Sequence, residues 1–212
     1  YIGLELGVVY SSFGSKVTIA EFLPSILSMA DQDLVKNLLN TLNNKFENIF
    51  TSTEITELIP KNNNQIIATF KNEKIFKDSF NKVLVCVGRE PNTKNLKIEK
   101  TGIKLDTKGF IPVNNQRRTL IPNIYAIGDV TGNPMLAHKA THEGKIAAEI
   151  IAGKDVIFDP IAIPSVIYTD PEIAWCGNTE NELNEKSIKY NKGEFPWQAN
   201  GSVRSSGSPS AS

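Results

Sequence analysis

The chain has 212 residues, 40% of them hydrophobic, and its 23 basic residues balance 23 acidic ones. That length is enough for one large domain or two small ones. A zero net charge without a clustered basic excess argues against a nucleic-acid-binding protein. No apolar run approaches the roughly 18 residues that a membrane span needs, and no signal peptide is recognisable.

The first residues of the chain are predicted to form a helix. Apolar side chains recur at helical spacing along residues 2–13, and Gly14 is the expected end of this helix. Residues 17–20 form a short apolar run, which predicts a buried strand that ends at Glu21. The predicted order is therefore a helix, a strand and then an acidic residue.

A second predicted helix begins near Asp31, a residue type that favours the N-cap position. Residues 66–70 and 83–87 are apolar runs that predict two more strands, and the polar residues 61–64 predict a turn. Helical and strand patterns thus alternate, as they do in α/β proteins. The apolar face of the second helix is formed by Leu34, Val35, Leu38, Leu39, Leu42 and Phe46.

The composition changes after Gly88, where an irregular connection begins. Residues 110–113 and 124–127 are predicted to be short strands. An alanine-rich helix is predicted for residues 137–152, with Gly153 at the position that commonly follows a helix.

The last part of the chain predicts two strands and a helix. The strands are expected at residues 165–169 and 173–176, and the spacing of Thr179 and Glu182 is that of a capping box, which would start a helix. Residues 201–212 are rich in Gly and Ser and are expected to be a flexible coil.

The opening YIGLELG has the character of the end of a dinucleotide-binding fingerprint. Gly3 would be its third glycine, which lets the helix pack closely on a strand, and Glu21 lies where a carboxylate accepts hydrogen bonds from the adenosine ribose. Such a carboxylate also repels a 2′-phosphate and so favours NAD over NADP. The alternative is a packing glycine and a solvated glutamate.

A second candidate site is the Gly128-Asp129 pair, which follows the apolar run at residues 124–127. Ligands of open α/β sheets bind at strand ends, and an aspartate there can accept hydrogen bonds from a polyol. The alternative is an ordinary turn with a capping aspartate.

The start of the alanine-rich helix, Met135-Leu136-Ala137-His138, is a third candidate, because a helix N-terminus presents free N–H groups and the positive end of its dipole. His138 and His142 have a spacing that can hold a metal, but no further ligand is evident, so no metal site is expected. Glu143 is interpreted as a polar helix residue.

Several other residues receive structural interpretations. The two cysteines, Cys86 and Cys176, form no paired motif and are expected to be small buried hydrophobes, compatible with a reducing cytoplasm. The pair Arg117-Arg118 is expected to be solvated.

Taken together, the motifs resemble the FAD-dependent pyridine nucleotide-disulfide oxidoreductases, and within that family the dihydrolipoamide dehydrogenases. The resemblance covers about residues 1–200. The motifs that carry it are YIGLELG, TIAE, VCVGREPN, IPNIYAIGDVTGNPMLAHKATHEG and IPSVIYTDPEIAWCGNTE.

The resemblance implies FAD and NAD as cofactors and assigns residues to each. For NAD these are Gly3, Glu5 beside the nicotinamide, Glu21 at the ribose, and Gly88. For FAD they are Asp129 at the ribityl chain, and Met135, Leu136, Ala137 and His138 along the isoalloxazine ring. No catalytic residue is expected here, because the family's redox disulfide and its His-Glu base match nothing in this sequence.

The implied fold class is α/β, in which a Rossmann-like NAD-binding domain without its first strand would span residues 1–87. A central FAD-contacting segment would span residues 88–158. The start of an α+β dimerisation domain would span residues 159–200, and a disordered tail would span residues 201–212.

The resemblance implies oxidation of dihydrolipoamide by NAD⁺ through FAD, in the E3 component of a cytoplasmic 2-oxoacid dehydrogenase complex. A homodimer that contacts other complex subunits and lipoyl domains is the implied assembly. Because the sequence begins at Tyr1, it is expected to be an internal piece that is inactive by itself. The alternatives are another flavin disulfide reductase, such as a mercuric reductase, and a non-catalytic NAD-binding module.

Overall fold

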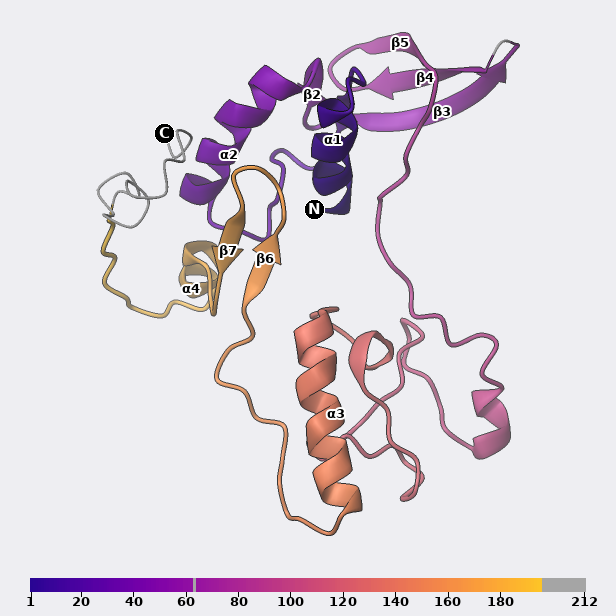
Figure 1. Cartoon of the computed structure of the whole chain (residues 1–212), viewed down its shortest axis with the longest axis vertical. Helices are drawn as coiled ribbons and strands as arrows, with labels where there is room; N and C mark the ends of the chain where they lie inside the picture. Colours follow the sequence, from indigo (N-terminus) through magenta and orange to yellow (C-terminus); the bar gives the residue numbers. More distant parts are fainter. Residues whose placement is uncertain (63, 196–212) are drawn as a thin grey trace. The chain divides into compact units, whose positions relative to one another are not determined.

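The computed structural model describes residues 1–62 and 64–195 (Figure 1). The predicted coil at residues 201–212 lies outside the described residues. Within residues 1–62 and 64–195, every helix is too short or too polar to cross a lipid bilayer.

The chain divides into two compact units. Unit 1 combines Tyr1–Cys86 with the chain from Val166 onward, and unit 2 is formed by Val87–Ser165. Unit 1 is therefore built from two segments that the whole of unit 2 separates in the sequence.

Unit 1 begins with the predicted helix and strand. Helix α1 spans Ile2–Ser12 and strand β1 spans Thr18–Ala20, and both confirm the expectation from the apolar spacing. Helix α2, Gln32–Lys45, then leads to strand β2, Asn48–Phe50, which pairs with β1 in parallel. The connection β1–α2–β2 is thus a βαβ unit. Its register joins Thr18 with Asn48, Ile19 with Ile49 and Ala20 with Phe50.

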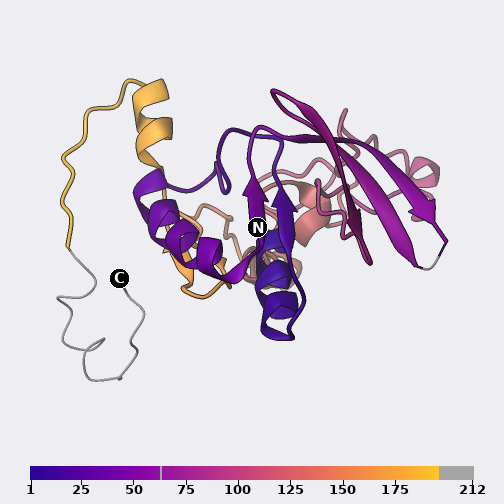
Figure 2. The ribbon, with the colours of Figure 1, turned by 90° about the horizontal axis from the view of Figure 1, so that it is seen from above.

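An antiparallel three-stranded sheet follows, in the order β3-β4-β5 (Figure 2). Its strands are Glu54–Lys61, Gln65–Lys71 and Ile75–Phe80. The central strand β4 was predicted, whereas its neighbours were not, since β3 is exposed along its whole length and carries no apolar alternation. Three rings of this sheet, those of Phe70, Phe76 and Phe80, pack together with the ring of Phe50 from β2.

The second segment of unit 1 begins within β6, Ser165–Ile167, and continues with β7, Ile173–Trp175, and α4, Glu180–Glu185. The predicted capping box is confirmed: Glu182 N–H donates to the Thr179 hydroxyl, and Thr179 N–H donates to the Glu182 carboxylate. Residues from both segments form one apolar core, namely Leu4, Ile26, Leu27, Ala30, Val35, Leu38, Leu42, Phe46, Ile167 and Ile173.

The role expected of Asp31 needs correction. It does occupy the N-cap position of α2, but its side chain makes no capping hydrogen bond. Its Oδ1 instead accepts a hydrogen bond of 2.8 Å from Glu180 N–H, so this carboxylate joins the start of α2 to the start of α4.

Unit 2 holds two short 3-10 helices, η1 at Ile98–Thr101 and η2 at Gly128–Thr131. The predicted alanine-rich helix is confirmed as α3, Ala137–Ile151, and Gly153 follows it at φ +87°. The small core beside these elements is formed by Ile98, Ile103, Ile111 and Ala126.

Three predicted strands are wrong. Residues 83–87, 110–113 and 124–127 are extended or irregular, without a strand ladder. A strand needs a sustained hydrogen-bonded neighbour, and these runs have little: the pairing near 124–127 is a single bridge between Arg118 and Tyr125. The mixed helix and strand composition nevertheless confirms the α/β class.

Candidate functional site

In unit 2, helix α3 begins without a side-chain cap. Its N-cap residue, Leu136, is extended and makes no side-chain hydrogen bond to the helix. The first N–H groups of a helix have no partner within the helix, and the dipole makes this end positive. Met135 and Leu136 are half-buried, while Ala137 and His138 are exposed. This helix start can therefore receive hydrogen-bond acceptors of a ligand.

Asp129 lies in η2, which precedes α3 in the chain. One Arg89 guanidinium nitrogen is 2.5 Å from Asp129 Oδ2, and the other donates to Met135 O over 3.4 Å. The side chain of Arg89 is 40% exposed and that of Asp129 is 41% exposed, so the carboxylate is accessible to a ligand. Arg89 thus connects two of the residues predicted to contact FAD.

The turn at Gly128 requires glycine. Its φ is +76°, a region that side chains with a Cβ rarely adopt. A Cβ there would also lie 3.2 Å from the Ala140 Cβ on α3. The turn and helix therefore approach more closely than a Cβ usually allows. The accessible carboxylate and the uncapped helix start fit a ligand that combines a polyol with a carbonyl-rich ring.

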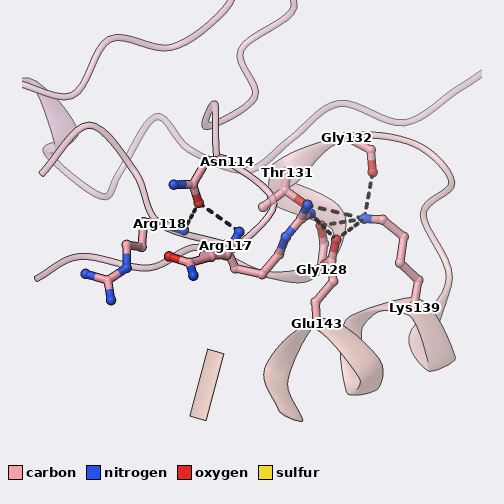
Figure 3. Close-up of polar contacts among 9 residues, drawn as sticks. Asn114, Arg117, Arg118, Gly128, Thr131, Gly132, Lys139 and Glu143 are labelled. Atoms are coloured by element: carbon pink, nitrogen blue, oxygen red, sulfur yellow. Dashed lines mark hydrogen bonds and ion pairs between the residues drawn. The ribbon is translucent and has the colours of Figure 1, made fainter. Parts of the chain in front are cut away.

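A charged network lies beneath this turn (Figure 3). The Glu143 side chain is fully buried, with Oε1 2.8 Å from Arg117 Nη1 and 3.2 Å from Lys139 Nζ. Its other oxygen, Oε2, accepts a hydrogen bond of 2.6 Å from Gly128 N–H. Glu143 is a polar residue of α3, as the sequence predicted, but its complete burial and its two ion pairs were not predicted.

Arg117 and Arg118 are not a solvated pair. The Arg117 side chain is only 11% exposed, and its guanidinium lies 4.6 Å from the centre of the Phe158 ring. Arg118 similarly lies over Tyr125, at 5.3 Å. Doublets of arginine usually face water, and only the fold reveals the buried carboxylate 26 residues later in the chain that binds Arg117.

In unit 1, the tightest helix contact occurs at Gly7 rather than at Gly3. A Cβ on Gly3 would lie 3.6 Å from the Cys86 Cβ, an ordinary contact, whereas one on Gly7 would lie 3.0 Å from Phe46 Cζ. Gly7 therefore allows α1 to pack against the end of α2. Its place one helical turn after Gly3 was the available sequence signal.

The two predicted carboxylates of unit 1 lie where their elements place them. Glu21 directly follows β1, and its Oε1 accepts a hydrogen bond of 2.8 Å from Leu23 N–H. Glu5 lies in α1, and its Oε1 accepts one of 2.9 Å from Tyr168 N–H. Both carboxylates are partly exposed.

The remaining candidates are more exposed. Gly88 has a φ of +138° and open space where a Cβ would lie. His138 Nε2 is 2.7 Å from Pro164 O. Among the residues that the structure describes, no group of three or more His, Cys, Asp or Glu could hold a metal. Cys86 is half-buried and Cys176 is exposed, so the expectation that Cys176 is a buried hydrophobe is wrong.

A separate charged cluster joins the residues around α4 to α2. Lys192 Nζ lies 2.8 Å from Glu180 Oε2, 3.2 Å from Asp33 Oδ2 and 2.8 Å from Glu194 Oε1. The hydrogen bond to Glu180 is the main reason that the pKa of Lys192 lies above its usual value. The hydrogen bond from Lys192 in turn lowers the pKa of Glu180.

The pKa of Asp33 is also lowered, although burial of its carboxyl group acts in the opposite direction. Burial raises the pKa, but the hydrogen bonds from Lys192 and from backbone N–H groups, together with the positive charge of Lys192, lower it more. Tyr190 donates its hydroxyl to Glu180 over 2.9 Å, and this bond raises the pKa of the phenol. The cluster is thus a charge-paired anchor for the chain that follows α4.

Residues 1–144 match the sequence profile of the pyridine nucleotide-disulphide oxidoreductases, and residues 163–211 match the dimerisation domain of the same proteins. The chain belongs to the pyridine nucleotide-disulphide oxidoreductase family. The family membership agrees with the resemblance carried by the five sequence motifs.

The similar curated proteins include dihydrolipoyl dehydrogenases. That of Vibrio parahaemolyticus is 45% identical over 202 residues, which are 94% of this chain and 42% of the relative. The human mitochondrial one is 44% identical over 203 residues, or 94% of this chain and 40% of the relative. The chain thus spans about two fifths of the length of these curated relatives.

Solved structures with the same fold include LpdA from Mycobacterium tuberculosis, with a TM-score of 0.86 at 25% identity over 97% of this chain and 44% of that one. The HOCl-induced flavoprotein disulfide reductase RclA from Escherichia coli has a TM-score of 0.83 at 25% identity, over 98% of this chain and 47% of that one. Both support the α/β fold of a flavoprotein disulfide reductase.

Proposed function

We propose that the chain is the nucleotide-binding and flavin-contacting part of a dihydrolipoyl dehydrogenase, which oxidises dihydrolipoamide and reduces NAD⁺ through FAD. The observation that carries the flavin part is the arrangement of one turn of unit 2. There the accessible Asp129 carboxylate and the uncapped start of α3 follow each other within eight residues, and Arg89 joins Asp129 to Met135. The identities of 42–45% to bacterial dihydrolipoyl dehydrogenases support this reaction.

Different residues would contact the two chemically distinct parts of the flavin, its ribityl chain and its ring. Asp129 would accept hydrogen bonds from the ribityl hydroxyls. The backbone N–H groups of Met135, Ala137 and His138 would donate to the ring carbonyls, where the positive helix end favours negative charge. Leu136, whose own N–H already donates to Pro134 O over 3.1 Å, would lie along the ring. When bound, FAD supplies the two-electron exchange between thiols and nicotinamide.

Unit 1 would bind NAD. Gly3, as the third fingerprint glycine, would let α1 pack closely on a strand, and Glu21, at the end of β1, would accept hydrogen bonds from the adenosine ribose. The negative charge of Glu21 opposes a 2′-phosphate. Glu5 would lie beside the nicotinamide. Gly88, a residue of unit 2, is assigned to NAD by the family resemblance alone.

The assembly and the domain division belong to the same proposal. The match to the dimerisation domain supports a homodimer. Other subunits of a 2-oxoacid dehydrogenase complex and lipoyl domains are the proposed partners, in the cytoplasm. The proposed domains are residues 1–87 for NAD, 88–158 for FAD contact and 159–200 for the start of the dimer interface.

A different flavin disulfide reductase is the second candidate. It is supported by the fold shared with the Escherichia coli reductase, although the identity of 25% is well below the 45% to a dihydrolipoyl dehydrogenase. The substrate test below separates the two.

The experiment uses the full-length gene product. Flavin absorbance after purification and NADH formation from dihydrolipoamide are measured for the unmodified protein and for Asp129→Ala. Losing a hydrogen bond to a charged group costs about 1.5–3 kcal/mol, so Asp129→Ala should bind FAD roughly ten- to hundredfold more weakly. Asp159→Ala, an exposed carboxylate of the same unit, is the control. A purified protein without flavin, or full FAD affinity in Asp129→Ala, would contradict the proposal.

A further inference from the structure

Two side chains of α3 hold the turn that carries Asp129 from beneath. Glu143 Oε2 accepts the Gly128 N–H over 2.6 Å. Lys139 Nζ donates to Gly128 O over 3.4 Å and to Gly132 O over 3.1 Å. Both polar groups of Gly128 and the end of the turn are therefore fixed to one face of the same helix (Figure 3).

The two holding residues are themselves paired. Lys139 and Glu143 are four residues apart on α3, and their charged atoms lie 3.2 Å apart. Arg117 forms the second ion pair of Glu143, at 2.8 Å, and its stacking on Phe158 fixes the guanidinium from the other side. One buried negative charge thus faces two positive ones.

We propose that Glu143 is a positioning residue for flavin binding, which acts through the Gly128 N–H and Lys139 to hold Asp129 in register with the start of α3. The proposal rests on the proposed function of Asp129 and α3. The Glu143 side chain is fully buried, so it would not contact the flavin itself. Its effect passes through the backbone of η2, because the residue next to Asp129 is the one that Glu143 holds.

The burial of the network argues that it does more than contribute to stability. A buried ion pair is weak support for folding, since desolvation offsets much of its attraction. However, the Glu143 carboxylate binds the Gly128 N–H and two cations at once. Its removal would take a hydrogen-bond acceptor from the N–H and a counter-charge from both cations. Such a network fixes one backbone geometry, which a ligand-binding turn requires.

The test measures FAD affinity by titrating flavin into the apoprotein of the full-length gene product. Glu143→Gln keeps an oxygen for the Gly128 N–H but loses the charge that pairs with Lys139 and Arg117. We expect it to weaken FAD binding roughly tenfold, at the low end of what one hydrogen bond to a charged group contributes. Glu149→Gln is the matched control, because Glu149 lies on the same helix in an exposed ion pair with Lys154.

The deciding measurement is a double-mutant cycle on the dissociation constant of FAD. If Glu143 acts through Asp129, the effect of Glu143→Gln should largely vanish in an Asp129→Asn background. A merely structural role would give additive effects, within about twofold. Lys139→Met, which removes the other hold on the same turn, gives a second cycle that does not depend on the folding of a Glu143 variant.

The outcomes separate this inference from the proposed function. If Glu143→Gln folds, coupling in its cycle supports the positioning role. In a protein whose unmodified form binds FAD, additive effects in that cycle or an unchanged affinity in Glu143→Gln would overturn the positioning role alone. If Glu143→Gln does not fold, the Lys139 cycle decides by the same two outcomes. An unmodified protein that binds no FAD would overturn the proposed function, and with it the role of Glu143.

Discussion

Glu5 of α1 accepts a hydrogen bond of 2.9 Å from the backbone N–H of Tyr168, although 163 residues separate them in the chain. The bond joins the two segments of unit 1. Glu5→Ala should therefore lower the free energy of unfolding by about 1 kcal/mol, as expected for one hydrogen bond. Glu5→Gln keeps an acceptor and should lose less. Denaturant unfolding and hydrogen exchange of the Tyr168 amide provide the measurement, and equal losses in the two variants would contradict this role.

Gly7→Ala should destabilise unit 1. The new Cβ would lie 3.0 Å from Phe46 Cζ, and Phe46 is buried and cannot move away easily. Overpacking costs about 1–3 kcal/mol, while alanine gains about 1 kcal/mol over glycine in a helix, so we expect a net loss of up to about 2 kcal/mol. Gly193→Ala, where a Cβ meets open space, is the control for denaturant unfolding. A more stable Gly7→Ala would show that α1 can shift.

The Lys192 cluster should stabilise its part of unit 1 across a defined pH window. Asp33 and Glu180 have lowered pKa values, so their contribution is complete above their usual values of 3.8 and 4.5 and is lost as the pH falls through the folded values. Lys192 has a raised pKa, so its contribution is complete below 10.5 and is lost as the pH rises beyond it.

The corresponding experiment compares the melting temperature of Lys192→Met with that of the unmodified protein as a function of pH. The difference should be constant from about pH 5 to pH 10 and should narrow in stronger acid, where the carboxylates are protonated. Lys189→Met, at an exposed lysine three residues earlier, is the control. A difference that grows in acid would contradict the sign of these pKa shifts.

Glu21 should select the nicotinamide cofactor. Removing its charge and adding a cation beside it, with Glu21→Ala and Phe22→Arg, should weaken the use of NAD and relieve the bias against NADP. Phe22 is an exposed residue, so the arginine can be accommodated. The ratio of kcat/KM for the two cofactors is the measurement, with Glu47→Ala at an exposed ion pair as the control. A preference for NADP in the unmodified protein would exclude this role of Glu21.

The elements that the sequence predicts well are those whose signal is local. The apolar spacing of α1, α2 and α3 and the capping box of α4 each depend on residues within a few turns of one another. The run at residues 83–87 has the composition of a strand, but a strand also needs a hydrogen-bonded partner from elsewhere in the chain. The composition of the run does not reveal whether such a partner exists. Among the described residues the run pairs with no strand, and the side chains of Leu84 and Val85 are exposed.

The candidate site divides in the same way. Asp129 could be found because it follows a recognisable apolar run. The start of α3 could be found because the pattern of a helix follows it. The ion pair of Arg117 with Glu143 could not be predicted, because the sequence around each residue is typical of an exposed surface. Only folding brings the two side chains together. The role of Asp31 was missed for the same reason, since its partner Glu180 lies 149 residues later.

The two-segment construction of unit 1 has a consequence for biosynthesis. Leu38 and Leu42 of α2 are fully buried in a core that also needs Ile167 and Ile173. The nearby pair Lys45 and Asp170 is separated by 125 residues, a length that a ribosome translates in roughly 6–25 s at 5–20 residues per second. During that interval the apolar face of α2 lacks its contacts with β6 and β7, and apolar surface that is exposed in this way is prone to aggregation until both strands have been synthesised.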